Sequence, residues 1–144
     1  MIKEFKGEYR WLSNFYPVEI KWDNLIFPSV EHAYQSCKSL DGDWKALCSG
    51  NTTPGKIKRL SKSICLPNKW TTNKVKIMWN LLELKFYQEP FKSLLLDTGN
   101  MRIQEGNLWG DTFWGVSLDT GVGKNMLGIM IMQIRDGLRF QRFF

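Results

Sequence analysis

Near its start the chain carries a short stretch in which apolar and charged positions alternate. Val18, Ile20 and Trp22 are apolar and each is followed by a charged residue, and Asp23-Asn24 then leads into the apolar run Leu25-Ile26-Phe27. Alternation with a period of two is typical of a half-buried strand, and Asp or Asn at the break suits a tight turn. The pattern predicts a β-hairpin.

Further along, apolar positions recur three and four residues apart, which is typical of helices that pack on a core. The first helix opens at Pro28-Ser29, with Ser29 as its N-cap. One face of this helix is apolar and consists of Val30, Ala33, Tyr34 and Cys37. A second face carries Glu31, Gln35 and Lys38 at positions i, i+4 and i+7.

The remaining elements are mostly helical, and they surround one long polar loop over residues 106–124. That loop is rich in Gly, Asp, Thr and Asn, and a structured loop of this length usually has a functional reason. The pattern predicts a helix capped by Thr53-Pro54, one from Thr72-Asn73 to about Glu89-Pro90, one from Pro90 to Leu95, a strand over 101–105 and a helix over 124–138. We therefore expect a helix-rich α+β fold in one domain over residues 1–144, with a small hairpin or sheet and several packed helices.

Length and charge limit the size of the fold and the classes of partner that the protein is expected to bind. A chain of 144 residues suits one domain and can bury a core without disulfides. The formal net charge of +6 favours an anionic partner such as phosphate, nucleotide or nucleic acid. Because no long basic run carries the excess, a small phosphorylated ligand is favoured over a nucleic-acid track.

The three cysteines are Cys37, Cys48 and Cys65, and no CxxC pair occurs, which indicates reduced thiols. The N-terminus lacks an apolar signal region, and no stretch is long enough to span a bilayer. From these features we expect a cytoplasmic protein without a membrane partner.

Common catalytic motifs are absent from the sequence. A single histidine, His32, excludes HExxH, and there is no zinc pattern, no GxxxxGK[ST] loop and no GxSxG. We expect neither a metal nor a cofactor. The remaining carboxylates, aromatic rings, amides and cations suit cleavage of a glycosidic bond, in which a carboxylate stabilises an oxocarbenium-like transition state or activates water.

Eight sequence blocks, in order, resemble the NADAR (YbiA-like) family over nearly the whole chain. The longest match is the segment P-S-V-E-H-A-Y-Q-S-C-K at residues 28–38, and residues 39–51 match nothing clear. The basic region that the family shows after the proline helix is matched loosely, by Lys58-Arg59 and Lys62. The other blocks are WLSNFYP at 11–17, Trp70, Lys85-Phe86, LLDTG at 95–99, Glu105, DTFWG at 111–115 and GKNMLG at 123–128 with MQIR at 132–135.

The resemblance implies an N-glycosidase that acts on a phosphorylated ribosyl substrate. Substrate classes of the family include ribosylaminopyrimidine phosphate intermediates of riboflavin synthesis and ADP-ribose attached to guanine, so ADP-ribosylated DNA is a candidate partner. With the family match, Glu31 is the main candidate for the catalytic carboxylate, as general base or oxocarbenium stabiliser, and Glu105 and Asp111 are further catalytic candidates. The candidate substrate-binding residues are Ser13, Asn14, Gln35, Lys38, Trp70, Trp114 and Asn125.

Each of these residues also has a structural interpretation. Glu31 can interact with a helix dipole, Asp111 can cap a turn, and Trp70 and Trp114 can belong to the core. Asn125 is expected to cap the last helix, and we expect His32 to be a hydrogen-bonding residue of the core rather than a catalytic one.

Two other classes of function stay open from the sequence. A non-catalytic NAD or ADP-ribose-binding module would use the same aromatic rings and cations. A nucleic-acid-binding protein would use the positive charge.

Overall fold

The computed structural model describes residues 1–141. Contacts between Cα atoms divide the chain into two compact units, which are considered separately. The central unit is Asn14–Lys85, and the terminal unit combines Met1–Ser13 with Phe86–Phe144. Helices dominate both and the strands are short, which confirms the expected helix-rich α+β class. One domain over 1–144 stays a prediction, and its last three residues lie outside the described part.

The central unit begins with the predicted hairpin. Strands β1 (Ile20–Trp22) and β2 (Leu25–Phe27) pair antiparallel, with Ile20 opposite Phe27 and both fully buried. The turn residues Asp23 and Asn24 have φ angles of 52° and 62°. Two consecutive positive φ angles define a type I′ turn, in which Asn and Asp are tolerated, so the hairpin is confirmed with its turn chemistry.

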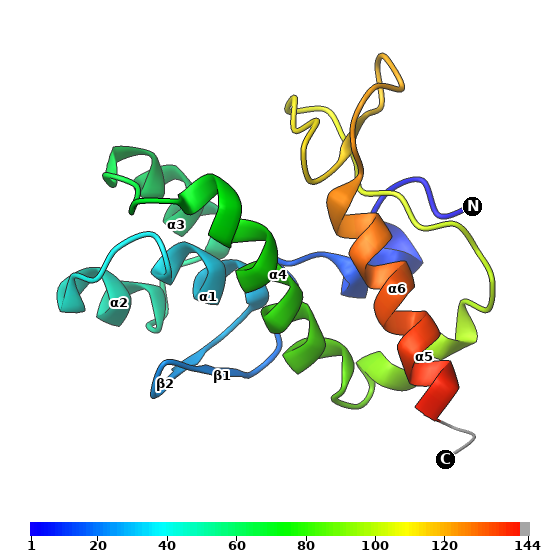
Figure 1. Cartoon of the computed structure of the whole chain (residues 1–144), viewed down its shortest axis with the longest axis horizontal. Helices are drawn as coiled ribbons and strands as arrows, with labels where there is room; N and C mark the ends of the chain where they lie inside the picture. Colours follow the sequence, from blue (N-terminus) through cyan, green and yellow to red (C-terminus); the bar gives the residue numbers. More distant parts are fainter. Residues whose placement is uncertain (142–144) are drawn as a thin grey trace. The chain divides into compact units, whose positions relative to one another are not determined.

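Helix α1 (Val30–Ser36) is buried along its whole length. Ser29 caps it, since its side chain accepts a hydrogen bond from the His32 backbone N–H. The helix packs against both strands of the hairpin and against helices α2 and α3, and Figure 1 shows it among these elements. Because α1 is covered on several sides, its second face, predicted as polar, is buried as well.

The other central helices are α2 (Gly42–Cys48), α3 (Pro54–Leu60), a 3-10 turn η2 (Ser61–Ser63) and α4 (Trp70–Phe86). Thr53 caps α3 through the Lys56 N–H, as predicted, with Pro54 in the first turn. The sequence did not predict α2. Helix α4 starts at Trp70, earlier than expected, and ends at Phe86 rather than near Pro90.

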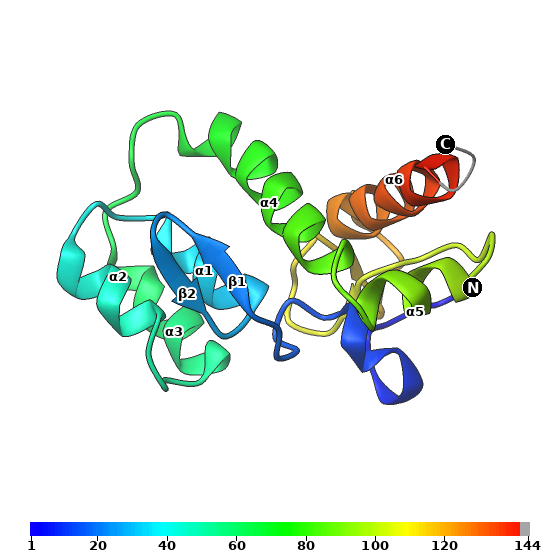
Figure 2. The same ribbon diagram turned by 90° about the horizontal axis from the view of Figure 1, so that it is seen from below.

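The terminal unit contains a 3-10 segment η1 (Gly7–Leu12), helices α5 (Phe91–Asp97) and α6 (Met126–Gln141), and strands β3 (Gly106–Asn107) and β4 (Val116–Ser117). Helices α5 and α6 lie side by side, as Figure 2 shows. The strand expected over 101–105 is reduced to one bridge, between Ile2 and Ile103. The segment expected to be only a loop contains a parallel pair, β3 with β4. The apolar stripe of the last helix is buried and comprises Leu127, Met130, Ile131, Ile134 and Leu138.

Within residues 1–141, no helix has the length and apolar character needed to cross a membrane.

Candidate functional site

Glu31 lies in the first turn of α1 and is 6% exposed. In the part of the chain that the structure describes, no other Asp or Glu is buried. Its backbone N–H donates to the Asn14 carbonyl (3.0 Å), and its Oε1 accepts a hydrogen bond from Gln35 Nε2 (2.8 Å). The structure therefore brings Glu31, Asn14 and Gln35 together, as the i, i+4 spacing predicted for the helical pair.

Burial raises the pKa of Glu31 above its ordinary value of 4.5. The hydrogen bond from Gln35 and the positive charges of Lys58 and Lys38 act in the opposite direction on this pKa. A carboxyl group whose pKa is raised toward the working pH is suited to gain and lose a proton during a reaction.

Lys38 lies about one helical turn after Gln35 in the chain, and its side chain faces two aromatic rings. Its Nζ is 5.6 Å from the centre of the Tyr34 ring and 5.9 Å from that of Trp70. The two rings are themselves 5.4 Å apart and tilted by 48°. Burial lowers the pKa of Lys38, and the negative charge of Glu31 raises it. The predicted residues Lys38 and Trp70 thus join the Glu31 cluster.

Two further lysines approach this cluster, and the sequence analysis did not select either of them. Lys58 and Lys74 both lower the pKa of Lys38 by charge repulsion. The Lys58 ammonium is also 5.8 Å from the centre of the Phe15 ring. Lys58 appeared in the sequence only as a loose match to a basic family region. The position of Lys74 at the start of α4 could not be linked to α1 from the sequence.

His32 is held in the core, as expected. Its Nε2 lies 2.6 Å from the Thr52 carbonyl and its Nδ1 lies 2.6 Å from Ser29 Oγ. Because a carbonyl only accepts, Nε2 carries a proton, and Nδ1 then accepts from the hydroxyl in the neutral ring. These bonds join α1 to the segment before α3, which is a structural role.

In the terminal unit, Asn107 forms hydrogen bonds with the other two predicted catalytic residues, Glu105 and Asp111. It is 1% exposed, and its Nδ2 donates to Glu105 Oε2 (3.0 Å) and to the Asp111 carbonyl (2.9 Å). Its Oδ1 accepts from the Asp111 N–H (3.0 Å). The sequence analysis missed Asn107, although its position two residues after Glu105 on an extended segment was a usable signal.

Asp111 caps a turn, as its structural interpretation predicted. Its Oδ1 accepts from the backbone N–H groups of Phe113 (3.1 Å) and Trp114 (2.9 Å). The Trp114 ring is half-buried and meets the Phe113 ring edge-on, with 4.8 Å between the ring centres.

Asn125 precedes α6, but its side chain does not cap that helix. Its Nδ2 donates to the Ile103 carbonyl (3.0 Å) and its Oδ1 accepts from the Glu105 N–H (2.9 Å). Asn125 has a positive φ of 53°. Because its side chain is hydrogen-bonded to the 103–105 segment, it does not make the expected capping bond.

Lys85, in the last turn of α4, is a further buried charged residue. It is fully buried, and burial lowers its pKa to about 7. The sequence analysis noted it only as part of a family block.

The predicted residues fall into two groups, one in each unit. The central group joins an acid, two amides, a cation and an aromatic ring at and near helix α1, and the terminal group, apart from Ser13, belongs to a hydrogen-bonded loop. The described residues contain no cluster of three or more His, Cys, Asp or Glu side chains that would hold a metal ion. The central group contains Asn14, Glu31, Gln35, Lys38 and Trp70, and the terminal group contains Ser13, Glu105, Asp111, Trp114 and Asn125.

The fold and this chemistry define a helix-rich α+β protein with a buried acid among lysines and aromatic rings. The sequence model of the NADAR domain matches residues 2–139, so the chain belongs to the NADAR family.

Curated relatives and a solved structure agree with this family. N-glycosidase YbiA of Escherichia coli K12 is 30% identical over 138 residues, covering 94% of this chain and 85% of that protein. An N-glycosidase of Nostoc punctiforme is 31% identical over 137 residues, covering 91% of this chain and 86% of that protein. The NMR structure of Escherichia coli YbiA is similar with a TM-score of 0.84 at 28% identity, covering 99% of this chain and 89% of that chain.

Proposed function

We propose that this chain is an N-glycosidase, a hydrolase that cleaves the bond between a base nitrogen and C1′ of a phosphorylated ribosyl group. The observation that carries the proposal is the position of Glu31, a buried carboxylate within the electrostatic reach of Lys38 and Lys58. The two curated relatives described above carry the name N-glycosidase, which supports the same reaction class.

Glu31 takes the central chemical role in this proposal. Its carboxylate accepts a proton from the attacking water, or stabilises the positive charge that develops on the ribosyl ring as the C1′–N bond breaks. The water oxygen bonds to C1′ and the bond electrons leave with the base nitrogen, which takes up a proton. The raised pKa of Glu31 makes the carboxyl a stronger proton acceptor than an exposed glutamate.

The surrounding cations and rings suit the rest of the substrate. Lys38, Lys58 and Lys74 place positive charge where a phosphate or pyrophosphate would bind. The rings of Tyr34 and Trp70 provide apolar faces on which a base stacks. In the free protein these rings adjoin the Lys38 ammonium, which keeps that cation partly sheltered from water.

Roles for the terminal group are part of the proposal and are less direct. We assign Glu105 as a candidate second carboxylate, because its Oε2 is oriented by the buried Asn107 amide. Asp111, Trp114, Asn125 and Ser13 remain candidates for substrate contacts. The hydrogen bonds of Asp111 and Asn125 already give these two a role in holding the loop over residues 103–125.

Two phosphorylated ribosyl substrates are proposed, namely ADP-ribosylated guanine in nucleic acid and a ribosylaminopyrimidine phosphate of riboflavin synthesis. The test is to incubate the protein with each substrate and to follow base release by mass spectrometry. Release of base and ribosyl phosphate or ADP-ribose from one of them is the expected result. Intact substrate in both reactions, with protein that is folded by circular dichroism, would contradict the proposal.

The alternative function is a non-catalytic NAD or ADP-ribose-binding module. The convergence of lysines and aromatic rings favours this alternative, since such groups hold a nucleotide without any need for a carboxylate. Calorimetric titration with ADP-ribose, combined with the base-release assay, separates the two. A binding module would bind tightly, release no base from any ribosyl substrate, and keep its affinity when Glu31 is changed to Gln.

A further inference from the structure

The side-chain oxygen of Gln35 is buried and accepts no hydrogen bond from residues 1–141. Gln35 is 3% exposed, and its Oε1 has no donor within hydrogen-bond distance in this described part of the chain. Its Nε2 is committed to Glu31 Oε1 (2.8 Å). Rotating the amide by 180° would place Oε1 against the carboxylate, so the observed orientation is the favourable one whenever Glu31 is ionised.

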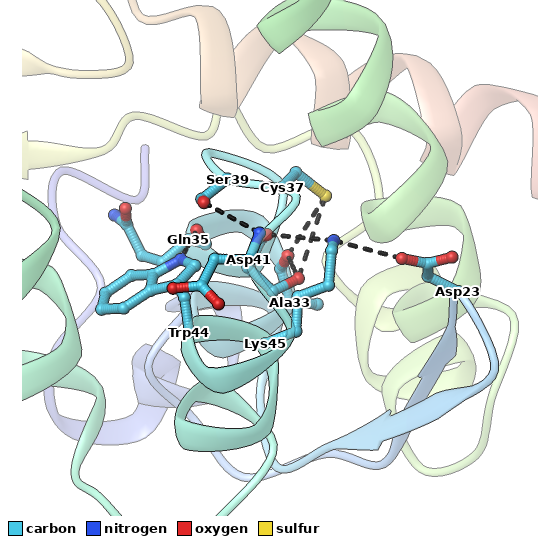
Figure 3. Close-up of polar contacts among 9 residues, drawn as sticks. Asp23, Ala33, Gln35, Cys37, Ser39, Asp41, Trp44 and Lys45 are labelled. Carbon is cyan, nitrogen blue, oxygen red and sulfur yellow. Dashed lines mark hydrogen bonds and ion pairs between the residues drawn. The ribbon is translucent and has the colours of Figure 1, made fainter. Parts of the chain in front are cut away.

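The position of Gln35 is fixed by its backbone rather than by its amide oxygen. The Gln35 carbonyl accepts a hydrogen bond from Trp44 Nε1 of α2 (2.9 Å). Figure 3 shows this bond, with the Gln35 side-chain amide extending away from the polar contacts drawn around Lys45. The Trp44 bond therefore fixes the backbone at Gln35 and the bond to Glu31 orients the amide, which leaves the amide oxygen without a donor among the described residues.

A second buried amide oxygen belongs to Asn14, whose backbone carbonyl accepts from the Glu31 N–H. Asn14 is 8% exposed, and its Oδ1 has no donor among the described residues. Its Nδ2 lies 3.5 Å from the sulfur of Met78, a weak acceptor. Two residues that bond to Glu31 thus each carry a buried acceptor without a donor in the described part of the chain, one in the segment before α1 and one a turn further along the helix.

A buried acceptor without a donor destabilises the free protein, so this arrangement calls for a ligand that donates hydrogen bonds. Ionised phosphate oxygens and the face of a stacked base cannot donate. The N–H groups on the edge of a base and the hydroxyl groups of a ribosyl ring can. The 2′-hydroxyl is attached to the carbon next to C1′, and C1′ is the atom that Glu31 must approach in the proposed reaction.

We propose that Gln35 Oε1 accepts a hydrogen bond from the 2′-hydroxyl of the substrate, so that Gln35 makes the enzyme selective for ribosyl over 2′-deoxyribosyl compounds. This inference rests on the proposed function. The Gln35 amide then connects the two partners of the reaction, because its N–H₂ holds Glu31 and its oxygen holds the sugar. Hydrogen bonds to a 2-hydroxyl strengthen as positive charge develops on the ring, so the contact stabilises the transition state.

The test compares a matched pair of N-ribosyl and 2′-deoxyribosyl substrates. The quantity measured is the ratio of their kcat/KM values, for the wild type and for Gln35→Met, which has similar size but only a weak thioether acceptor. The deoxy compound is intrinsically more labile, but this difference is the same for each enzyme and cancels between the two ratios. We expect the preference for the ribosyl substrate to fall by roughly 10- to 100-fold in Gln35→Met, the range that corresponds to one buried hydrogen bond.

Two more variants separate this role from a merely structural one. Gln35→Glu keeps an acceptor but loses the donor to Glu31, so the ribosyl preference is retained while the acidic limb of the pH profile moves to higher pH. Gln133→Met, on an exposed position of α6, is the matched control and changes neither quantity.

Equal losses on both substrates in Gln35→Met, with an unchanged ratio, would overturn the inference and leave the proposed function standing. If the wild type cleaves neither substrate, the proposed function fails instead. The inference is then decided by calorimetric affinities for ADP-ribose and 2′-deoxy-ADP-ribose. A wild-type preference for ADP-ribose that Gln35→Met removes would support it, and equal affinities would overturn it.

Discussion

Burial raises the pKa of Glu31, which suits the proton transfer proposed for it, and the same burial makes the ionised carboxylate destabilising to the folded protein. The pKa of the carboxyl is raised in the folded state, mainly by desolvation, while in the unfolded chain it titrates near 4.5. A raised folded pKa means that folding is favoured while the group is protonated in both states. The contribution of Glu31 to the free energy of unfolding is therefore fully present below the unfolded pKa. It is lost as the pH rises through the folded pKa.

This linkage predicts the pH dependence of Glu31→Gln stability. The variant cannot ionise, so it should avoid the loss of stability that the wild type suffers above about pH 4.5. We expect the melting temperature of Glu31→Gln to equal or slightly trail that of the wild type in acid and to exceed it increasingly toward neutral pH. Differential scanning calorimetry at several pH values measures this, and a difference that is independent of pH would contradict the assignment.

Lys38 should influence both binding and the protonation of Glu31. Its positive charge lowers the Glu31 pKa, so Lys38→Met should raise that pKa further. If ionised Glu31 is the active form, the acidic limb of the kcat/KM profile then moves to higher pH. Since Lys38 is proposed to bind the substrate phosphate, its removal should also raise KM by roughly 10-fold or more. Lys76→Met, an exposed position on α4, is the control and should leave the profile unchanged.

At the residue scale, helical spacing in the sequence linked Glu31 to Gln35 and Lys38, while Asn14, Trp70 and the catalytic role of Glu31 were expected from the resemblance to the family. It could not predict the burial of this face, which depends on α2 and α3 packing around α1. Lys58 and Lys74 were missed for the same reason, since their approach to Lys38 is set by the packing of three helices. Burial rather than spacing is what turns Glu31 into a candidate proton acceptor.

At the element scale, the segments with local signals were predicted well. The hairpin turn and the two capped helices are specified by a few adjacent residues, such as Ser29 and Thr53. Helix α2 lacks a clear apolar stripe, because only Trp44 and Cys48 are buried in it, so no periodicity revealed it. The β3–β4 pair is two residues long on each side and joins distant segments, which a local pattern cannot show.

The loop between Glu105 and Asn125 is held by close packing, and Gly115 tests this. A Cβ at Gly115 would overlap the backbone and carboxylate oxygens of Glu105 and the Asn107 amide. Because a backbone atom cannot move aside easily, Gly115→Ala should destabilise the protein by roughly 1–3 kcal/mol, the usual cost of overpacking.

Gly137→Ala provides the matched control for that experiment. Gly137 lies in α6 with open space around its Cβ position, so alanine there should be neutral or stabilising by a few tenths to about 1 kcal/mol. Urea unfolding of both variants gives the comparison. Equal stabilities of the two variants would show that the 105–125 loop is not packed as described.

At the scale of the whole molecule, the net charge of +6 is unevenly distributed along the chain. Residues 44–82, all within the central unit, contain no Asp or Glu. The eight basic residues of this segment are Lys45, Lys56, Lys58, Arg59, Lys62, Lys69, Lys74 and Lys76. The unit that holds the Glu31 cluster therefore carries most of the positive charge, which the count for the whole sequence did not reveal.

This charge distribution predicts that the KM for a polymeric substrate depends on the basic residues on and beside α3. On ADP-ribosylated DNA, replacing Lys56, Arg59 and Lys62 by Gln should raise KM, because the three are exposed on or beside α3. The salt dependence of KM should also weaken, by about one unit of slope for each DNA phosphate that the variant no longer neutralises. On a small ribosylaminopyrimidine phosphate the same triple variant should behave almost as wild type.

A second triple variant controls for the reduced net charge. Lys3, Arg102 and Lys124 are exposed residues of the terminal unit, and their replacement by Gln removes the same number of charges. If the two triple variants raise KM on DNA equally, the effect comes from net charge and the proposed role of the α3 region is wrong.

The role of Glu31 is tested most directly by single-turnover cleavage with wild type and Glu31→Gln. The substrate is whichever ribosyl compound the wild type accepts, and its affinity is measured in parallel. We expect Glu31→Gln to bind with a similar Kd but to release base roughly 100- to 10,000-fold more slowly, the usual contribution of a general base. Release by Glu31→Gln at the wild-type rate would contradict the central role of this carboxylate.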